Sequence, residues 1–269
     1  MLTNKTIVLG VTGSIASYKA ADLASKLTQA GAGVEVIMTE SAAKFINPLT
    51  FRAVTGRSVV NSMWDINSNF SVEHVALAEA ADLVVIAPAT ADIIAKLASG
   101  IADDSLTTTV LATKAPLIIA PAMHTGMWRN AVTRENVAQL KNRNFTIIEP
   151  GYGFLASGCL GEGRLAEIDT ILGTIRQVLG RTGTLAGKKV VVTAGGTREP
   201  IDPVRFLGNR SSGKMGYAVA EAARDRGAEV VLVAGPTAIP DPAGIALVRI
   251  RTALQMKQAV DKAVTDADV

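Results

Sequence analysis

The chain has 269 residues, 48% of them hydrophobic and 19% charged, so it can bury a large core and is not a disordered protein. Its net charge is only +3, and the scattered basic residues give no support to nucleic-acid binding. The longest segment without a charged side chain, 115–128, contains two prolines and is too short to span a bilayer, and the N-terminus has no signal-peptide pattern, which together predict a soluble, cytoplasmic protein with no membrane partner.

Short apolar runs typical of strands alternate with amphipathic runs of helical length in residues 7–149. We predict strands at 7–11, 34–38, 83–87, 116–120 and 146–149, and helices at 17–30, 91–98, 105–113 and 130–143. Strands separated by single helices form βαβ units with right-handed crossovers. The sequence therefore predicts an α/β fold with a mostly parallel sheet flanked by helices.

Residues 150–165, PGYGFLASGCLGEGRL, interrupt this alternation with five glycines and no apolar period. A stretch of this kind in a compact domain is more often a functional flap or a mobile loop than a simple connection. A helix is predicted next, at 167–179, and it is followed by a linker.

A second strand and glycine turn, KKVVVTAGGT, begins after Gly187 and resembles the start of the chain. We predict further strands at 229–234 and 247–250, and helices at 217–226 and 253–267. Only 83 residues lie between Gly187 and Val269, fewer than most domains contain, and the final DADV is typical of the start of a strand. The sequence thus predicts a second α/β domain that is incomplete in a truncated chain.

Three strand-to-helix turns in the first part have the composition of a ligand site. Residues 10–16, GVTGSIA, offer backbone N–H groups at a helix N-terminus, which favour an anion such as phosphate. Their spacing is not the GxGxxG of dinucleotide sites, and a plain βα turn is equally compatible with it. Residues 87–91, APATA, and 120–124, APAMH, are two further turns of small residues and proline. Because ligands bind beyond the carboxyl ends of parallel strands, the three turns together predict a floor for a planar phosphorylated cofactor.

The chain contains two histidines, His74 and His124, and one cysteine, Cys159. A lone histidine is more often structural than catalytic, and two histidines without a third ligand do not predict a metal site. A single cysteine excludes an internal disulfide. Cys159 is either an incidental small residue or a thiol that the flap delivers to a site.

The second part has two candidate phosphate-binding segments. Residues 194–198, AGGTR, form a glycine turn after a strand, and residues 209–214, NRSSGK, place hydroxyls, N–H groups and a cation before a helix. The latter segment lacks the spacing of a Walker A motif. A helix N-cap followed by a solvated lysine is the alternative interpretation.

Longer strings in both parts match a known family: GVTGSIASYKA, VEH, ADLVVIAPATADIIAKLASGIADD, APAMHTGMW, TAGGTREPIDPVRFLGNRSSGKMG and VAGPT. On these strings, residues 1–180 resemble the homo-oligomeric flavin-containing cysteine decarboxylases. The whole chain resembles the bifunctional phosphopantothenoylcysteine decarboxylase/phosphopantothenate–cysteine ligase family of coenzyme A biosynthesis. The resemblance implies a Rossmann-like or flavodoxin-like decarboxylase domain at 1–180, a linker at 181–186, and the N-terminal part of a second Rossmann-like domain, the ligase, at 187–269.

In this family the first domain uses FMN to decarboxylate 4′-phosphopantothenoylcysteine to 4′-phosphopantetheine, through oxidation of the thiol, loss of CO2 and re-reduction. The second domain joins cysteine to 4′-phosphopantothenate through an acyl-cytidylate, with CTP and Mg2+. The resemblance therefore implies FMN as the cofactor of the first domain, and a ligase activity that a truncated chain would lack. It also implies self-association as trimers or a higher homo-oligomer, with the active site between subunits.

The resemblance also assigns roles to individual residues. His74 corresponds to the catalytic acid/base of the decarboxylase, and Asn209 to the asparagine that handles the acyl-cytidylate. The residues implied to contact substrate are Met123 and His124 at its carboxylate, and Ser211, Ser212 and Lys214 at phosphate groups. The residues implied to bind FMN are Gly13, Ser14, Ile15, Thr39, Pro88, Ala89, Thr90, Ser105 and Ala122.

Three positions depart from the family pattern. His124 stands where the family has Asn; imidazole can still donate a hydrogen bond to a carboxylate, and as a cation it would bind more strongly, so we expect an altered pH response. The flap cysteine of the family, which acts in the reductive step, corresponds to Ser157, with Cys159 two residues later. Because residues i and i+2 of an extended chain face the same side, Cys159 could take that role. Asp92 stands where Asn is usual near the flavin.

Two other functions are compatible with the first part of the chain. One is an FMN-binding regulatory subunit, which the changes at Ser157 and His124 favour weakly and the presence of His74 disfavours weakly. The other is a cysteine decarboxylase that acts on peptides. The ligase-like strings of the second part have no use in either, so we predict a decarboxylase fused to an incomplete ligase.

Overall fold

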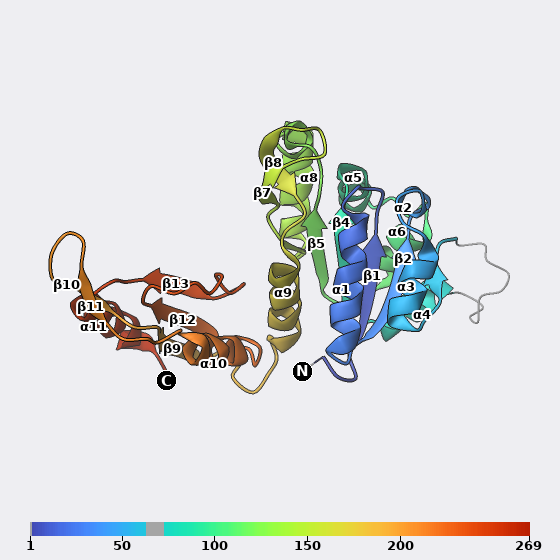
Figure 1. Ribbon diagram of the computed structural model, residues 1–269. Coiled ribbons are helices and arrows are strands. Elements are labelled where there is room, and N and C mark those ends of the chain that lie inside the picture. The colour runs from blue at the N-terminus through green and yellow to red at the C-terminus, as the bar shows by residue number, and fades with distance from the viewer. Residues whose placement is uncertain (1, 63–72) are drawn as a thin grey trace. The chain divides into compact units, whose positions relative to one another are not determined.

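The computed structural model describes residues 2–62 and 73–269 and contains two compact units, Met1–Leu172 and Gly173–Val269, called here the N-terminal and the C-terminal unit (Figure 1). The unit boundary falls inside helix α9 (Ile168–Gly180), earlier in the chain than the linker expected at 181–186. No helix among the described residues is long and apolar enough to cross a membrane.

The N-terminal unit is built on a six-stranded sheet whose strand pairs are all parallel, which confirms the predicted sheet. Its strand order is β3-β2-β1-β4-β5-β6. Strands β2 and β3 are added on one side of β1 and strands β4 to β6 on the other, so the order of addition reverses between β1 and β4 although these two strands are parallel. In sheets of this kind the reversal point opens a crevice at the carboxyl ends of the strands. The strands are β1 (Thr6–Val11), β2 (Gly33–Met38), β3 (Val59–Val60), β4 (Leu83–Ala89), β5 (Leu117–Pro121) and β6 (Thr146–Ile147).

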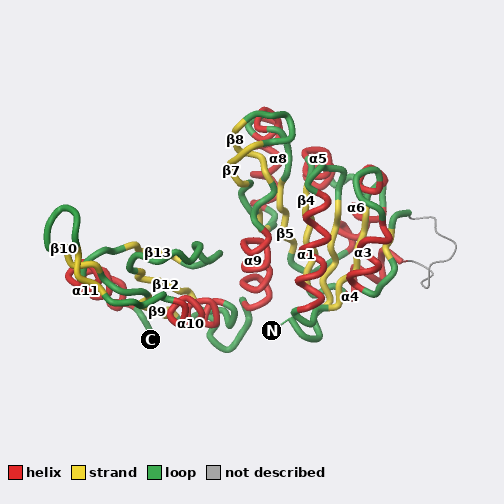
Figure 2. The backbone as a smooth tube through the Cα atoms, in the orientation of Figure 1, coloured by secondary structure: helices red, strands yellow, loops and turns green. Residues whose placement is uncertain are grey.

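Helices cover both faces of this sheet (Figure 2). One face packs against α1 (Ser17–Gln29) and α3 (Pro48–Thr55). The other packs against α4 (Glu73–Ala80), α5 (Ala91–Ser99), α6 (Ser105–Ala112) and α8 (Ala131–Asn142). Two helices of four residues, α2 (Glu40–Ala43) and α7 (Thr125–Trp128), follow the carboxyl ends of β2 and β5.

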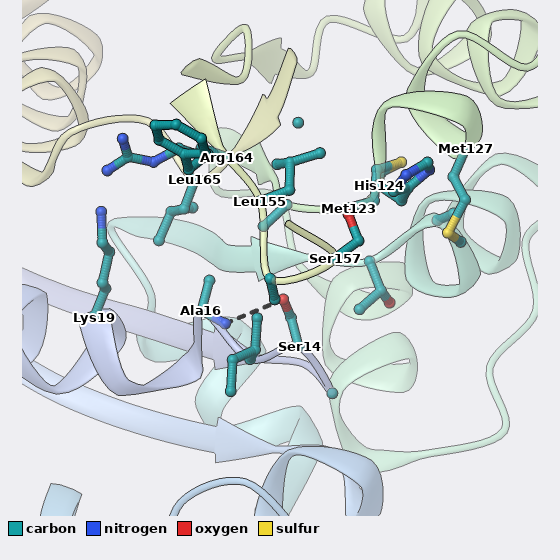
Figure 3. A pocket seen from close by; sticks show the side chains of 18 of the residues that line it. Ser14, Ala16, Lys19, Met123, His124, Met127, Leu155, Ser157, Arg164 and Leu165 are labelled. Carbon is teal, nitrogen blue, oxygen red and sulfur yellow. Dashed lines mark hydrogen bonds between the residues drawn. The ribbon is translucent and has the colours of Figure 1, made fainter. Parts of the chain in front are cut away.

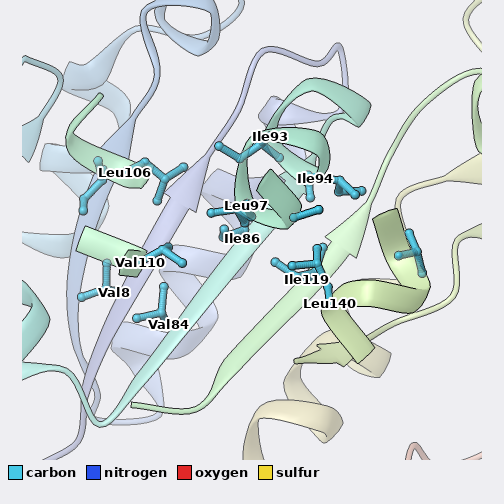
Figure 4. Close-up of a cluster of buried hydrophobic side chains, with 14 of the residues drawn as sticks. Val8, Val84, Ile86, Ile93, Ile94, Leu97, Leu106, Val110, Ile119 and Leu140 are labelled. Carbon is cyan, nitrogen blue, oxygen red and sulfur yellow. The ribbon is translucent and has the colours of Figure 1, made fainter. Parts of the chain in front are cut away.

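Branched aliphatic side chains fill the second interface, as the low aromatic content requires. Val8, Val84 and Ile119 of the sheet belong to one buried cluster with Ile94 and Leu140 of the covering helices (Figure 4). The strands buried on both faces are continuous apolar runs, which is why β4 and β5 could be located from sequence.

Asp82 joins the amino ends of the two central strands. Its carboxylate accepts hydrogen bonds from Lys5 Nζ and from Thr6 N–H, each 2.8 Å long. Partial burial opposes ionisation of Asp82, but these two hydrogen bonds outweigh it, and the pKa of the carboxyl lies below its ordinary value. Ionised Asp82 therefore stabilises the fold.

We expect Asp82→Asn to lower the free energy of unfolding of the N-terminal unit by about 1–2 kcal/mol at neutral pH. Because the folded-state pKa is lowered, the stabilisation is complete above the unfolded-state pKa of about 3.9 and is lost as the pH falls through the folded-state pKa. Urea unfolding, monitored by tryptophan fluorescence, measures this loss of stability, since both tryptophans of the sequence fall in the residue range 1–172. Asp22→Asn, which breaks only an exposed pair with Lys26, is the control and should change little. An Asp82→Asn effect that is independent of pH would contradict the assignment.

Residues 150–165, expected to be an irregular flap, contain an antiparallel hairpin of β7 (Gly151–Phe154) and β8 (Leu160–Arg164). Alternate glycines removed the apolar period that identifies strands. The connection between the two strands is a turn at 155–159, with Gly158 at φ +81°.

The C-terminal unit has a parallel sheet in the order β13-β12-β9 and a separate hairpin. The final residues lie beside β9, where Val191 N–H donates to the Val269 carbonyl over 2.9 Å. Buried Arg224 donates to Asp225 Oδ1 and to the Ala243 carbonyl. The elements are β9 (Lys189–Ala194), β10 (Arg198–Pro200), β11 (Phe206–Gly208), α10 (Lys214–Arg224), β12 (Glu229–Ala234), β13 (Ala246–Arg249), α11 (Ala253–Ala263) and a 3-10 turn at Val264–Asp266.

Candidate active site

A cavity of about 620 Å³ lies at the carboxyl ends of β1, β4 and β5, where the strand order reverses. The three predicted turns and the β7–β8 hairpin form its walls (Figure 3). The predicted residues that line it are Gly13, Ser14, Ile15, Thr90, Ala122, Met123 and His124. The turns that the sequence singled out thus meet around one space.

Thr12 holds two of these turns together. Its buried hydroxyl donates to the Pro88 carbonyl over 2.7 Å and accepts from Thr90 N–H over 3.1 Å. The next residue must be glycine, because a Cβ on Gly13 would overlap the side chain of Ser41. The β1–α1 turn is therefore fixed against the β4–α5 turn, with the N-terminus of α1 at the cavity.

The hairpin is attached to the β5–α7 turn through Gly163. Met123 N–H donates to the Gly163 carbonyl over 2.9 Å, and Gly163 has φ +138°, a conformation that side chains disfavour. A Cβ at this position would overlap the Met123 carbonyl oxygen. Thr125 adds a hydrogen bond from its hydroxyl to the Glu162 carbonyl, 2.6 Å long. The hairpin is thus an ordered wall of the cavity.

The two cationic side chains that line this space lie on the same side of it. Lys19 and Arg164 lie on one side of the view in Figure 3, and His124 and Met127 lie on the other. Sequence reasoning did not assign Lys19 or Arg164 to the site, although Lys19 belongs to the GVTGSIASYKA string and Arg164 to the glycine-rich segment 150–165.

Four residues expected at the cofactor do not belong to the described cavity lining. Pro88 and Ala89 lie directly beneath the lining, since Ala89 accepts the N–H of Ala122. Thr39 caps α2 at the end of β2, beside β1. Ser105 begins α6, and its hydroxyl is buried with no hydrogen-bond partner in the part of the chain that the structure describes.

The catalytic candidate His74 lies apart from this cavity. It is half-buried in the first turn of α4, on the sheet face that α4, α5 and α6 cover, and it is not among the described residues that line the cavity. Its neighbours Ser71 and Val72 in the sequence lie outside the described residues.

The two flap residues do not share one side of an extended strand, so the premise for Cys159 was wrong. Gly158 N–H donates to the Leu155 carbonyl and Leu155 N–H to the Cys159 carbonyl, each over 2.9 Å, which closes a turn. Ser157 lines the cavity, whereas Cys159 is exposed and is not among the described lining residues. The sequence signal for a turn at this place was the run of small residues Ala156, Ser157 and Gly158, of which Gly158 adopts a positive φ.

The two phosphate-type segments of the C-terminal unit come together. A Cβ on Gly196 would overlap Asn209 Oδ1, so the Asn209 side chain lies against the 194–198 turn. The same oxygen accepts from Ser211 N–H over 3.0 Å, and Ser212 and Lys214 continue into the start of α10. Thr237 of the VAGPT string packs beside this turn and was not predicted as part of it.

Comparison with family models decides the classification. The model described as Flavoprotein matches residues 1–180. The chain belongs to the flavoprotein family. Residues 185–269 of this flavoprotein match a second model, the DNA/pantothenate metabolism flavoprotein C-terminal domain.

Curated relatives match this flavoprotein chain over all or nearly all of the given sequence. It is 48% identical to the coenzyme A biosynthesis bifunctional protein CoaBC of Mycolicibacterium smegmatis, over 100% of this chain and 66% of that protein. It is 47% identical to CoaBC of Bacillus subtilis, over 97% of this chain and 65% of that protein. The chain therefore spans slightly less than two thirds of these relatives.

Solved structures match the N-terminal part of the flavoprotein. The FMN-dependent cysteine decarboxylase SpaF is 35% identical with a TM-score of 0.58, covering 65% of this chain and 96% of its own. A cysteine-to-serine mutant of a PPC decarboxylase, complexed with pantothenoylaminoethenethiol, is 32% identical with a TM-score of 0.58, covering 64% of this chain and 96% of its own. Both likenesses confirm the flavodoxin-like fold expected for the first part.

Proposed function

We propose that the N-terminal unit binds FMN and decarboxylates 4′-phosphopantothenoylcysteine to 4′-phosphopantetheine in coenzyme A biosynthesis, in the cytoplasm. The observation that carries the proposal is the single cavity formed by the three turns and the hairpin, in a chain of the flavoprotein family. The relatives named CoaBC support the pathway, and the FMN-dependent neighbours support the cofactor.

The residues present fit an FMN group. Gly13 and Ser14 place a backbone N–H group and a hydroxyl, respectively, at the start of α1, a position that suits a phosphate. Small side chains such as Ala122 leave room for a flat ring against the backbone.

FMN, when bound, supplies an acceptor and a later donor of two electrons, which allows a cysteine-derived carboxylate to lose CO2. The chain's own residues orient the substrate and handle protons. His124 and Met123 hold the carboxylate, and the hairpin excludes water from the reacting groups. His74 takes the proton of the substrate thiol as general base.

We propose further that His74 acts in the cavity of a neighbouring copy, in a trimer or a higher homo-oligomer. This explains why a catalytic base lies outside the cavity of its own chain. Ile15 and Tyr18 at the cavity are 59% and 63% exposed, so a neighbouring copy would bury large apolar side chains there.

We propose that, in a protein as long as the CoaBC relatives, the C-terminal unit contributes to CTP- and Mg2+-dependent ligation of cysteine to 4′-phosphopantothenate. Asn209 would contact the acyl-cytidylate, and Ser211, Ser212 and Lys214 would bind phosphate groups. The packing of Asn209 against the 194–198 turn supports this assignment, because it places both segments at one end of the sheet.

The decarboxylase is tested by mixing FMN-loaded protein with 4′-phosphopantothenoylcysteine and following CO2 and the organic products by mass spectrometry. The proposal predicts CO2 release in every preparation that contains bound flavin. An FMN-loaded protein that releases no CO2 would end the enzymatic proposal and would favour the regulatory flavoprotein.

The product composition tests the roles of Ser157 and Cys159. Ser157 lines the cavity and Cys159 does not, so we expect slow re-reduction of the decarboxylated, still oxidised product, an aminoenethiol. Under air this aminoenethiol would escape, while dioxygen takes up the two electrons held by the reduced flavin. Ser157→Cys should raise the ratio of 4′-phosphopantetheine to aminoenethiol by at least about 10-fold, within the range of one positioned acid. Cys159→Ser is the matched control and should leave the ratio unchanged. An increase of aminoenethiol in Cys159→Ser would show instead that Cys159 reaches the site.

A further inference from the structure

His124 makes a hydrogen bond that fixes where its ring carries a proton. It precedes α7 with φ −63° and ψ 146°, the backbone of an N-cap residue, and Gly126 N–H donates to its Nδ1 over 3.1 Å. A ring nitrogen that accepts a hydrogen bond carries no proton, so the proton of the neutral ring is on Nε2.

We propose that His124 is a neutral imidazole of fixed tautomer that presents one N–H donor, Nε2–H, to a carboxylate in the cavity. The identity of the carboxylate rests on the proposed function; the tautomer does not. The sequence left a neutral and a cationic ring open, and the structure favours the neutral one, because the cap occupies the nitrogen that a second proton would need. His124 thereby selects ligands by the direction of a hydrogen bond rather than by charge.

Asparagine combines the same two functions in one side chain. Its amide oxygen caps a helix and its –NH2 group donates a hydrogen bond. The structure therefore explains how a histidine can stand where the family pattern has asparagine: Nδ1 replaces the amide oxygen and Nε2–H replaces the amide donor.

The carboxylate nearest in the structure's contacts to the His124 turn already has a cationic partner. Glu162 on β8, whose carbonyl accepts from the Thr125 hydroxyl, pairs with Arg129 over 3.3 Å. The Glu162 carboxylate is therefore engaged by Arg129, which agrees with a neutral His124 ring.

The tautomer can be read directly by nitrogen-15 NMR of histidine-labelled protein at about pH 8, well above the usual imidazole pKa of about 6.5. The chain has only two histidines, so His74→Gln leaves the His124 ring as the single signal. The proposal predicts an unprotonated Nδ1 and a protonated Nε2. A protonated Nδ1 would overturn it.

Three variants separate the cap from the donor. The probe is the hydroxyl analogue of the substrate, 4′-phosphopantothenoylserine, titrated into FMN-loaded protein by calorimetry. His124→Asn, with cap and donor, should bind within about 3-fold of the natural chain, whereas His124→Ala, with neither, and His124→Asp, with the cap alone, should each bind at least about 10-fold more weakly.

Tight binding by His124→Asp, or a loss in His124→Asn equal to that in His124→Ala, would refute the donor role. If the analogue fails to bind the natural chain, the proposed substrate is wrong, while the NMR spectrum still decides the tautomer.

Discussion

Replacing His74 by Asn is expected to lower the rate of CO2 release by at least about 100-fold, within the range of one positioned acid/base, while FMN stays bound. Asn cannot accept the thiol proton. Because His74 is not among the described residues that line the cavity of its own chain, its loss leaves the walls of that cavity intact. Single-turnover CO2 release and the flavin-to-protein absorbance ratio measure the two effects separately.

The matched control is Glu79→Gln, an exposed position on the same helix, which should change neither readout. Action across subunits adds a sharper test. A His74→Asn chain retains its cavity, and a chain with a damaged cavity retains His74, so mixed oligomers of the two should regain CO2 release that neither has alone. Full activity in pure His74→Asn protein, or mixtures that stay inactive, would contradict the assigned role.

Gly163→Ala is expected to weaken FMN binding by at least about 10-fold and to supply the damaged cavity for that mixture. The added Cβ would overlap the Met123 carbonyl oxygen, a backbone atom that cannot rotate away, and alanine is strained at φ +138°. The hairpin must therefore move away from the β5–α7 turn. Fluorescence titration of FMN into the flavin-free protein measures the loss.

Gly158→Ala is the control in the same hairpin. Gly158 also has a positive φ, +81°, but a Cβ there would meet no atom within 4 Å. It should cost only the local strain of about 1–2 kcal/mol and leave FMN affinity close to that of the natural chain. Equal affinities of Gly163→Ala and the natural chain would show that the hairpin does not form part of the FMN site.

Much of the N-terminal unit could be predicted because buried parallel strands are continuous apolar runs. Strands β1, β2, β4 and β5 and helices α1, α5, α6 and α8 were predicted within one or two residues of their observed bounds. The short elements were missed: β3 has two residues, and α2 and α7 have four each, too few for a periodic pattern. The eight-residue helices α3 and α4, which lie between β2 and β4 in the chain, were not predicted either. The hairpin was missed because the glycines of β8 remove the apolar alternation that identifies a strand.

The site was predictable where it depends on strand ends and not where it depends on distant contacts. Gly13, Thr90 and Ala122 follow strands that the sheet places side by side, so their convergence follows from the topology. The separation of His74 from the cavity and the turn between Ser157 and Cys159 depend on tertiary packing and on a positive φ, which no periodicity reports. The protonation pattern of His124 likewise required the cap at Gly126 to be seen.

The central claim, that the cavity holds an isoalloxazine ring, is tested most directly by the visible absorption spectrum of the purified chain. The account predicts a yellow protein with flavin bands, or a colourless one that binds one FMN per chain and turns yellow when FMN is added. A protein that stays colourless and leaves FMN fluorescence unchanged throughout a titration would contradict it.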